Sequence, residues 1–298
     1  MPFFRGRTFI LAIPPWDFRM LWYGTLAKRN RLIYHTSWPR WEIGSVPRRY
    51  GLFSHLLKGY WHRVLSSSSV QIVVVASEAA KVVSQQFPKT HVSVIPHVVS
   101  SDFDEVTLNR PKGAFGVLFV GELIEKKGVS LLPTLIERLA DLSTVHFGIV
   151  GAGALEPLVN SLEQQDTVSV YGKVSSRRDL AKIYAQHQVL IVPSQRTSRW
   201  EELFGMVIVE AMAVGLPVIA SDHVGPRSII THGEDGFLVS EASVDEFAHS
   251  IRHLCEQLAD WERMSSNAKA NAVRYSLESV SLQWIELLSS QDSFAANV

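Results

Sequence analysis

Cysteine is almost absent from this sequence, which contains a single one, Cys255, among 298 residues. A lone thiol excludes a disulfide framework and a zinc site built from clustered cysteines. Because disulfides mark oxidising compartments, we expect a cytoplasmic protein. The 11 histidines lack the spacing of metal ligands, so we expect no metal site and interpret most of them, including His223 and His232, as structural or surface residues.

Long hydrophobic runs are also missing. No apolar stretch approaches the roughly 20 residues that a membrane-spanning helix requires. The run Phe9–Ile13 follows two arginines, as in a signal peptide, but it ends at Pro14 and lacks a small-residue cleavage site. We therefore interpret this run as a buried strand.

The whole chain has no net charge, with 29 Lys and Arg against 29 Asp and Glu, but these charges are unevenly distributed along it. Residues 1–110 carry 14 Lys and Arg against 6 Asp and Glu, whereas residues 111–298 carry 15 against 23. The basic part also holds five of the eight tryptophans. Two lobes with different partners would produce this asymmetry, and the basic lobe could attract an anionic acceptor or an anionic membrane surface. A solvated positive face beside ordinary core tryptophans explains it equally well. No RNA-binding motif accompanies the basic residues, so we expect no nucleic-acid partner.

From residue 117 onward, short apolar runs alternate with longer amphipathic stretches. The runs are rich in Val and Ile, as expected of strands buried on both faces of a parallel sheet. The amphipathic stretches Leu131–Leu142, Ala154–Leu162 and Asp179–His187 predict helices between them. Six such repeats predict a doubly wound α/β domain. The predicted strands are Val117–Val120, Val145–Val150, Val168–Tyr171, Val189–Val192, Val218–Ala220 and Phe237–Val239.

The first part of the chain shows the same alternation less completely, and it predicts a smaller Rossmann-like sheet. A polar stretch between His97 and Lys112 marks the domain boundary. We predict an N-terminal domain over 1–104, a C-terminal domain over 105–275 and a final helix over 276–298 that can pack back on the first domain. The predicted strands are Thr8–Ile13, Arg31–Thr36, Gln71–Ala76 and Val92–Ile95, and the predicted helices are Phe18–Arg29, Tyr50–Leu65 and Glu78–Phe87.

The most informative stretch follows the strand that ends at Pro193. A polar loop leads into a predicted helix over residues 205–214. The N-terminus of this helix would lie at the carboxyl edge of the sheet, where open α/β folds bind ligands, and its free amides can receive an anion. Glu202 and Glu210 would flank that point, and their carboxylates suit vicinal hydroxyls because each oxygen accepts a hydrogen bond. Taken alone, such a pair is more often an ordinary feature of a helix surface.

The stretch from Glu202 to Ala220 resembles the donor-binding segment of family 4 glycosyltransferases, which have the GT-B fold of two Rossmann-like domains. It contains two glutamates separated by seven residues and then Ala-Met-Ala-x-Gly-x-Pro-Val-Ile-Ala. Four further segments resemble that family in the same order, so the resemblance covers residues 92–258. These segments are Phe119–Gly128, Gly148–Gly153, Tyr171–Val174 and Gly233–Val239.

The resemblance implies roles for individual residues. The glutamate matching Glu210 holds the ribose hydroxyls of a nucleotide-diphospho-sugar donor, and the one matching Glu202 contacts the donor sugar. The lysine matching Lys127 offsets the charge of the diphosphate. Such enzymes retain the anomeric configuration and use no catalytic metal and no cofactor, since the nucleotide sugar is itself a substrate. Further donor contacts, to the sugar, the diphosphate and the base, are implied for Gly121, Lys173, Val174, Arg196, Phe204 and Gly205.

One position in the donor loop departs from the family pattern. The residue after Gly121 is usually an arginine that contacts the diphosphate, and here it is Glu122. A carboxylate at that position would repel the diphosphate unless it points away or another cation compensates. Lys126, Arg196 and Arg199 are available for that purpose.

The first domain resembles the family less than the second and appears incomplete, because the early strand-turn-helix units of family members are absent. His35 resembles the histidine that the family places beside the transferred sugar, although a histidine that ends a strand explains it equally well. We predict a glycosyltransferase that moves a sugar to an unknown acceptor. Two alternatives stay open: a nucleotide-sugar-binding protein without transferase activity, and a nucleotide-sugar epimerase of the same fold.

Overall fold

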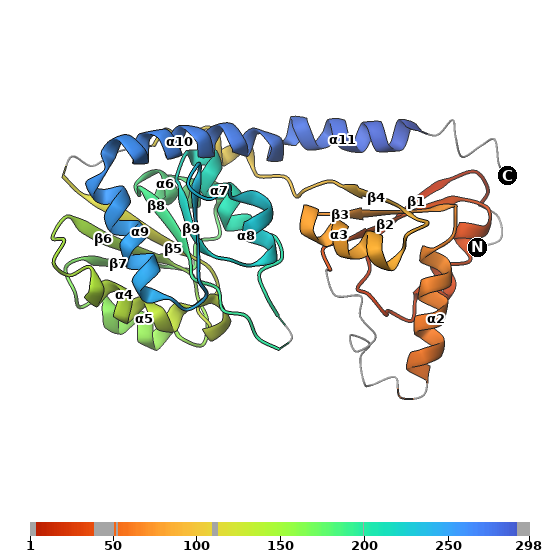
Figure 1. Ribbon diagram of the computed structural model, residues 1–298, viewed down its shortest axis with the longest axis horizontal. Helices are drawn as coiled ribbons and strands as arrows, with labels where there is room; N and C mark the ends of the chain where they lie inside the picture. Colours follow the sequence, from red (N-terminus) through yellow and green to blue (C-terminus); the bar gives the residue numbers. More distant parts are fainter. Residues whose placement is uncertain (1–3, 39–50, 52, 109–112, 199, 291–298) are drawn as a thin grey trace. The chain divides into compact units, whose positions relative to one another are not determined.

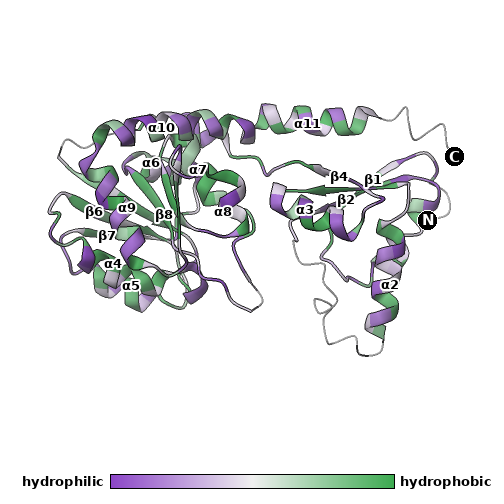
Figure 2. Cartoon of the chain, viewed as in Figure 1, coloured by the Kyte–Doolittle hydropathy of each residue, from purple (hydrophilic) through white to green (hydrophobic). Residues whose placement is uncertain are grey.

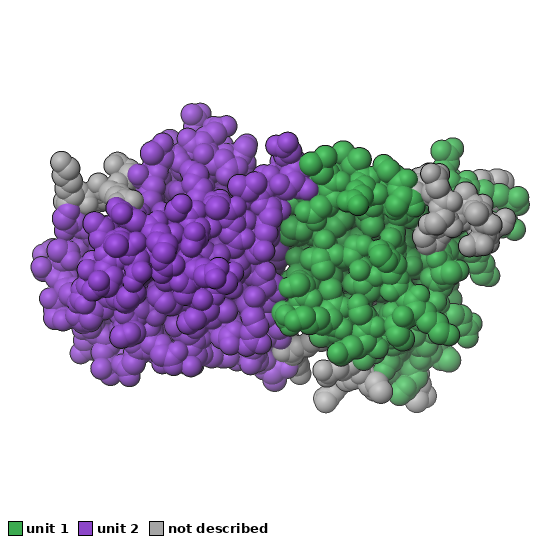
Figure 3. Space-filling view, turned by 45° about the horizontal axis from the view of Figure 1, so that its top comes forward, with its two compact units in different colours: residues 1–97, 280–298 green, residues 98–279 purple. Residues whose placement is uncertain are grey.

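A computed structural model describes residues 4–38, 51, 53–108, 113–198 and 200–290 of the chain (Figure 1). It divides into two compact units, coloured separately in Figure 3: unit 1 is Met1–His97 with Val280–Val298, and unit 2 is Val98–Ser279. The sequence placed these boundaries after residues 104 and 275. The short helix η4 (Ser101–Phe103) belongs to unit 2 because Phe103 packs edge-on against Tyr184, with ring centroids 5.4 Å apart.

Unit 1 is built on a parallel sheet with the strand order β1-β2-β3-β4. All five residues of β3 are buried, and four of them are apolar, as expected when both faces of a strand are covered. The fifth, Gln71, accepts a hydrogen bond from Arg31 at 2.6 Å. The four strands predicted for this region are confirmed, with small differences at their ends. The elements are β1 (Thr8–Leu11), α1 (Met20–Tyr23), η1 (Leu26–Lys28), β2 (Arg31–Thr36), α2 (Phe53–Leu65), β3 (Val70–Val74), α3 (Ser77–Gln86) and β4 (His91–Val94).

The single helix predicted over Phe18–Arg29 is wrong, because the structure has the two short helices α1 and η1 there. The interruption falls at Gly24. A Cβ atom on Gly24 would lie 2.6 Å from Cγ2 of Val64 and 2.9 Å from the hydroxyl of Tyr60, both on α2. Close packing against α2 therefore requires a glycine at this point, and glycine is a poor helix former.

The last helix, α11 (Leu277–Ser289), completes the core of unit 1. Val280 and Leu287 are buried in one cluster with the sheet. The guanidinium of Arg31 donates to the carbonyl oxygens of Leu287 and Leu288, at 2.5 and 3.3 Å. A cation at the last carbonyls of a helix satisfies acceptors that have no partner within the helix. The sheet residues of this cluster are Ile33, Val73 and Ile95.

Unit 2 contains a parallel sheet with the order β10-β9-β8-β5-β6-β7, and the six strands predicted for it are confirmed. Figure 2 shows these strands in the colour of hydrophobic residues, as expected for a sheet with helices on both faces. The strands are β5 (Phe115–Val120), β6 (Val145–Val150), β7 (Val168–Gly172), β8 (Val189–Val192), β9 (Val218–Ser221) and β10 (Gly236–Val239). The helices are η5 (Glu125–Lys127), η6 (Val129–Leu131), α4 (Leu132–Arg138), α5 (Glu156–Leu162), α6 (Arg177–Ala185), α7 (Met206–Val214), α8 (Val224–Ile229), α9 (Val244–Glu256), α10 (Leu258–Ala272) and η7 (Val273–Tyr275).

The strand order of unit 2 reverses between β5 and β8. From β5 the chain adds β6 and β7 on one side, and it then crosses over to add β8, β9 and β10 on the other. Such a reversal leaves a crevice outside the carboxyl ends of the two central strands, because the connections that follow them run to opposite sides. The crevice of unit 2 therefore lies beyond Val120 and Val192, where β5 and β8 end.

Candidate functional site

A cavity of about 190 Å³ lies at this crevice. It brings together four of the residues implicated by sequence, which come from two separate segments: Gly121, Lys127, Glu202 and Gly205. The complete lining consists of Phe119, Val120, Gly121, Glu122, Lys127, Val192, Ser194, Glu202, Gly205, Met206 and Val207.

An ion pair spans the cavity between the loops that follow β5 and β8. Nζ of Lys127 lies 2.5 Å from Oε2 of Glu202, and the hydroxyl of Ser194 lies 3.4 Å from the same oxygen. Gly128 makes this approach possible: its φ is +76°, and a Cβ atom there would lie 1.9 Å from the carbonyl oxygen of Pro193. A glycine is therefore required where the two loops touch.

The ring of Trp200 lies close to Lys127 of this pair and to the neighbouring Lys126. The ammonium groups of Lys126 and Lys127 lie 4.8 and 4.9 Å from the centre of its ring. An aromatic face attracts cations through its quadrupole, so the ring draws both positive charges toward the crevice. The sequence reasoning did not identify Trp200, although an indole within a polar loop was a usable signal.

The N-terminus of α7 forms one wall of the cavity. Its N-cap is Gly205, with φ of +84°, and no side chain caps the helix there. The first amides of a helix have no acceptor within the helix, and together with the helix dipole they favour an anion. Met206 and Val207, the first residues of α7, both line the cavity. This wall can therefore receive an anionic group.

Glu210 lies one turn further into α7 and is only 3% exposed. One of its carboxylate oxygens pairs with the guanidinium of Arg177, and the other accepts a hydrogen bond from the hydroxyl of Tyr184 at 3.1 Å. Burial raises the pKa of the Glu210 carboxyl, while Arg177 and Tyr184 favour the ionised form. A carboxylate offers about four acceptor sites, so these two partners do not use all of them, but Glu210 does not line the cavity. Arg177 and Tyr184 were not identified from the sequence.

Phe204 lies in the turn before α7 and does not line the cavity. Its side chain is buried and packs edge-on against Tyr275, with ring centroids 5.9 Å apart. A Cβ atom on Gly225 would lie 2.5 Å from the amide nitrogen of Phe204, so the chain of α8 passes very close to this backbone. The turn before α7 is thereby held between α8 and the core.

The cavity lining does not include Lys173, Val174 or Arg196. Lys173 is exposed and Val174 partly exposed, in the loop between β7 and α6. The side chain of Arg196 pairs with Glu201 at 3.3 Å. Arg199 lies outside the described residues. Glu122, the departure from the family pattern, is exposed and lines the cavity.

His35 lies on β2 of unit 1 and not at this cavity. Its ring is edge-on to Trp284 of α11 at 5.6 Å and to His97 at 6.2 Å, between ring centroids. Burial and the charge of His97 lower the pKa of His35. The imidazole is therefore favoured in its neutral form.

Neither a metal-binding cluster nor a membrane-spanning helix occurs among the described residues. No group of three or more His, Cys, Asp or Glu side chains in this part of the chain is arranged to hold a metal ion. None of the helices formed by the described residues is sufficiently long and apolar to cross a bilayer.

Sequence comparison finds relatives among glycosyltransferases. An uncharacterized glycosyltransferase of Haemophilus influenzae is 24% identical over 282 residues, which are 91% of this chain and 74% of that protein. The D-inositol 3-phosphate glycosyltransferase of Corynebacterium urealyticum is 31% identical over 192 residues, 60% of this chain and 44% of that protein. This chain thus spans less than half the length of the second relative.

Solved structures of low sequence identity share the fold. The Anabaena protein HepE in complex with UDP has a TM-score of 0.70 at 23% identity, covering 90% of this chain and 74% of that one. The pneumococcal O-GlcNAc transferase GtfA, in complex with UDP and GlcNAc, has a TM-score of 0.66 at 19% identity, covering 89% of this chain and 53% of that one. These neighbours support the predicted GT-B class with Rossmann-like units.

The match to a family is located on unit 2. Residues 100–271 match the family described as "Glycosyl transferases group 1", and this region contains Lys127, Glu202 and Glu210. The matched region makes up more than half of the 298 residues. This protein therefore belongs to the group 1 glycosyl transferase family.

Proposed function

We propose that this protein transfers a sugar from a nucleoside-diphosphate sugar to an acceptor, with the donor bound in the crevice of unit 2. One observation carries the proposal: Lys127, Glu202 and the uncapped N-terminus of α7 meet at one cavity, at the reversal of strand order. An ammonium group and free helix amides suit a diphosphate, and a carboxylate suits the hydroxyls of a sugar.

The ion pair between Lys127 and Glu202 could couple binding of the diphosphate to binding of the donor sugar. A diphosphate at the N-terminus of α7 would attract Lys127 more strongly than one carboxylate does, since it carries more negative charge. Glu202 would then be released to accept hydrogen bonds from the donor sugar. In this scheme Lys127, Arg196 and the amides of α7 stabilise the leaving diphosphate, and such preorganised donors contribute about 3–4 kcal/mol.

Glu210 is proposed to hold the ribose. Arg177 and Tyr184 leave part of its accepting capacity unused, and diol recognition requires a carboxylate held in one orientation. The backbone at Lys173 and Val174 would meet the base. HepE and GtfA were solved with UDP bound, which supports a nucleoside diphosphate donor and makes UDP the first probe.

The proposal includes retention of the anomeric configuration, no metal and no cofactor, as the family 4 resemblance implies. His35 keeps the role beside the transferred sugar that the same resemblance implies. The acceptor is a lipid-linked sugar, a glycan or a small molecule.

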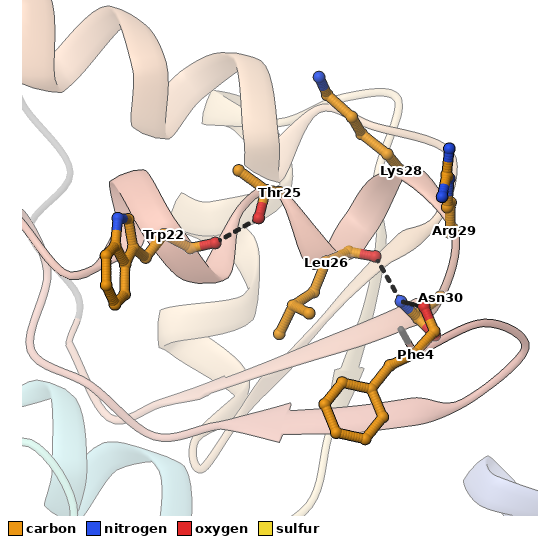
Figure 4. Close-up of a pocket in the computed structure, with 7 residues that line it drawn as sticks. All are labelled: Phe4, Trp22, Thr25, Leu26, Lys28, Arg29 and Asn30. Carbon is orange, nitrogen blue, oxygen red and sulfur yellow. Dashed lines mark hydrogen bonds between the residues drawn. The ribbon is translucent and has the colours of Figure 1, made fainter. Parts of the chain in front are cut away.

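Contact between unit 1 and an anionic membrane surface in the cytoplasm is the second part of the proposal. Trp22 is 75% exposed and lines, with Phe4, a cavity of about 470 Å³. Lys28 and Arg29 line the same cavity, as Figure 4 shows. An exposed indole that shares a cavity with two cations matches the boundary between lipid headgroups and acyl chains, since the ring prefers that boundary and the cations prefer anionic headgroups.

Calorimetry with UDP, GDP and ADP tests donor binding, followed by assays of nucleotide release from the corresponding sugar donors. We expect one nucleotide to bind and Lys127→Met to weaken it by at least about tenfold, which corresponds to about 1.4 kcal/mol. Binding without any turnover of the donor would favour the binding-only alternative. Conversion of the donor into an epimeric nucleotide sugar would favour the epimerase. If none of the nucleotides binds, the proposal is wrong.

A further inference from the structure

Hydrogen bonds connect the three loops that follow β8, β9 and β10. The amide N–H of Glu202 donates to Nδ1 of His223 at 3.2 Å. Nε2 of the same ring lies 3.3 Å from Oε2 of Glu241. The other oxygen of Glu241 accepts a hydrogen bond from the amide N–H of Arg196. Glu202 and Arg196 belong to the loop between β8 and α7, so this chain of hydrogen bonds fastens that loop at two points.

The hydrogen bonds determine which ring nitrogen of His223 carries the proton. Nδ1 accepts from Glu202 N–H and therefore has no proton, so the proton of the neutral ring is on Nε2. Nε2–H then donates to Glu241, whose ionised carboxylate accepts on both oxygens. His223 is completely buried, and burial lowers its pKa, which favours this neutral form.

The carbonyl group of Glu202 is held from the same side. It accepts a hydrogen bond from the amide of Gly225 at 2.9 Å. Both backbone polar groups of Glu202 are thus bound to the segment that follows β9. With its backbone held in this way, Glu202 directs its carboxylate to Lys127, across the cavity.

We propose that His223 and Glu241 are positioning residues, which hold the backbone of Glu202 so that its carboxylate faces the donor sugar. This inference rests on the proposed function, because it assumes that Glu202 binds the sugar. Neither residue lines the cavity, so neither is a catalytic residue. Misplacing a reacting or substrate-holding group by about 1 Å can lower a rate about 100-fold.

Conservative variants test the two hydrogen bonds of the His223 ring one at a time. The side-chain oxygen of asparagine occupies about the position of Nδ1, so His223→Asn keeps an acceptor for Glu202 N–H. His223→Ala removes both bonds. In Glu241→Gln, the amide group places N–H donors against either the His223 ring or the Arg196 N–H, and one of the two bonds must be lost.

The chain offers a matched control at His232. Nδ1 of this ring also accepts a backbone N–H, but the donor, Leu238 at 3.1 Å, does not line the donor cavity, whereas Glu202 does. His232→Ala removes the same kind of hydrogen bond from the same unit. An effect that both His223→Ala and His232→Ala produce therefore reflects a general loss of stability and not a change at the donor cavity.

The test measures UDP binding and UDP release from UDP-glucose or UDP-N-acetylglucosamine on the full chain. We expect His223→Ala and Glu241→Gln to lower the turnover number about 10- to 100-fold and to change the dissociation constant of UDP by less than about threefold. His223→Asn restores the acceptor for Glu202 N–H but not the bond to Glu241, so it should recover part of the lost turnover, and His232→Ala should leave both quantities unchanged. Equal losses of UDP affinity and turnover, or no recovery with asparagine in a folded protein, would overturn the inference.

A spectroscopic measurement decides the inference separately from the proposed function. Long-range ¹H–¹⁵N spectra of the histidine rings should show His223 as the Nε2–H tautomer, and Glu241→Gln should disturb that signal. The Nδ1–H tautomer would rule out the bond from Glu202 and overturn the inference. Failure of the parent protein to bind any nucleotide would instead contradict the proposed function, whatever the tautomer.

Discussion

The two units of this protein both contain parallel sheets, but their strands are ordered differently. In unit 1 the four described strands follow one another in chain order, so each connection extends the sheet in one direction. In unit 2 the order reverses between β5 and β8, and the cavity with Lys127 and Glu202 lies at that reversal. The excess of positive charge lies in the first part of the chain and not beside this cavity. The position of the proposed donor cavity therefore follows the strand order and not the excess of positive charge.

The largest effect is expected where two loops of unit 2 touch at the reversal. Gly128→Ala combines a left-handed backbone conformation with a Cβ atom 1.9 Å from the carbonyl oxygen of Pro193, and we expect it to destabilise unit 2 by about 3 kcal/mol or more. Gly233 has φ of +80° and nothing within 4 Å of its added Cβ atom, so Gly233→Ala is the control and should cost only about 1–2 kcal/mol. Denaturant unfolding followed by circular dichroism measures both. Equal losses would show that the contact between the loops is unimportant.

A charge reversal at the cavity should come next. Glu122 is exposed at the cavity, and removing a like charge about 6 Å from a diphosphate is worth roughly 2–3 kcal/mol before screening. Glu122→Arg should therefore tighten UDP binding by at least about tenfold, and more at low salt than at high salt. Uridine, which lacks phosphates, is the control and should bind unchanged. Equal effects on UDP and uridine would mean that the substitution acts through the loop and not through charge.

Substitutions of Glu210 and Glu202 should affect different quantities, UDP affinity and turnover respectively. Glu210→Ala should weaken UDP binding by about 1–3 kcal/mol, because a hydrogen bond to a charged group is lost. Glu202→Gln should leave UDP affinity nearly intact and lower the turnover of the UDP-sugar, because this carboxylate is assigned to the sugar. Calorimetry and a nucleotide-release assay measure the two quantities. If both variants weaken UDP equally, the roles are misassigned.

A fall in pH should destabilise the two units to different extents, because they contain different numbers of buried or partly buried histidines. Burial lowers the pKa of three histidines in unit 1 and two in unit 2 from the ordinary value of 6.5. The unfolded chain then binds more protons below pH 6.5, so stability is complete above that pH and falls as the pH drops below it. We expect the unfolding temperature of unit 1 to fall more than that of unit 2 between pH 7 and 5, as measured by calorimetry. The histidines are His35, His62 and His97 in unit 1 and His187 and His223 in unit 2.

Carboxyl groups whose pKa is raised in the folded protein should increase this difference. Burial raises the pKa of three of them in unit 2, so that acid favours the folded state there. Replacing His97 by asparagine should reduce the acid sensitivity of unit 1. A larger loss in unit 2 would contradict the prediction. The carboxyls are Asp104, Glu210 and Asp235.

The smallest effect is expected at the membrane surface. Each well-placed cation near an anionic bilayer contributes about 1 kcal/mol, and salt weakens it. The protein should sediment with phosphatidylserine vesicles at low salt, less at high salt, and Lys28→Glu and Trp22→Ala should each reduce binding. Lys173→Glu in unit 2 is the control. Absence of binding at low salt would favour the solvated-face explanation of the basic region.

The sequence predicted the sheets better than it predicted the contacts between loops. Strands buried on both faces need continuous Val and Ile, a pattern visible within a few residues, and so their positions were recovered in both units. The pairing of Lys127 with Glu202 depends on how two loops 75 residues apart meet, which local patterns do not encode. His223 was interpreted as structural or surface for the same reason. Only the fold shows that its ring faces Glu202 and Glu241.

The helix α11 has a consequence for the order in which the protein folds during its synthesis. Unit 2 is one continuous stretch, Val98–Ser279, whereas unit 1 is completed by residues made after it. Until Val280 and Leu287 leave the ribosome, the apolar side chains Ile33 and Val73 have no helix to cover them. The unit that is synthesised first is therefore the last to be finished, and the nascent chain carries an open apolar surface throughout the synthesis of unit 2.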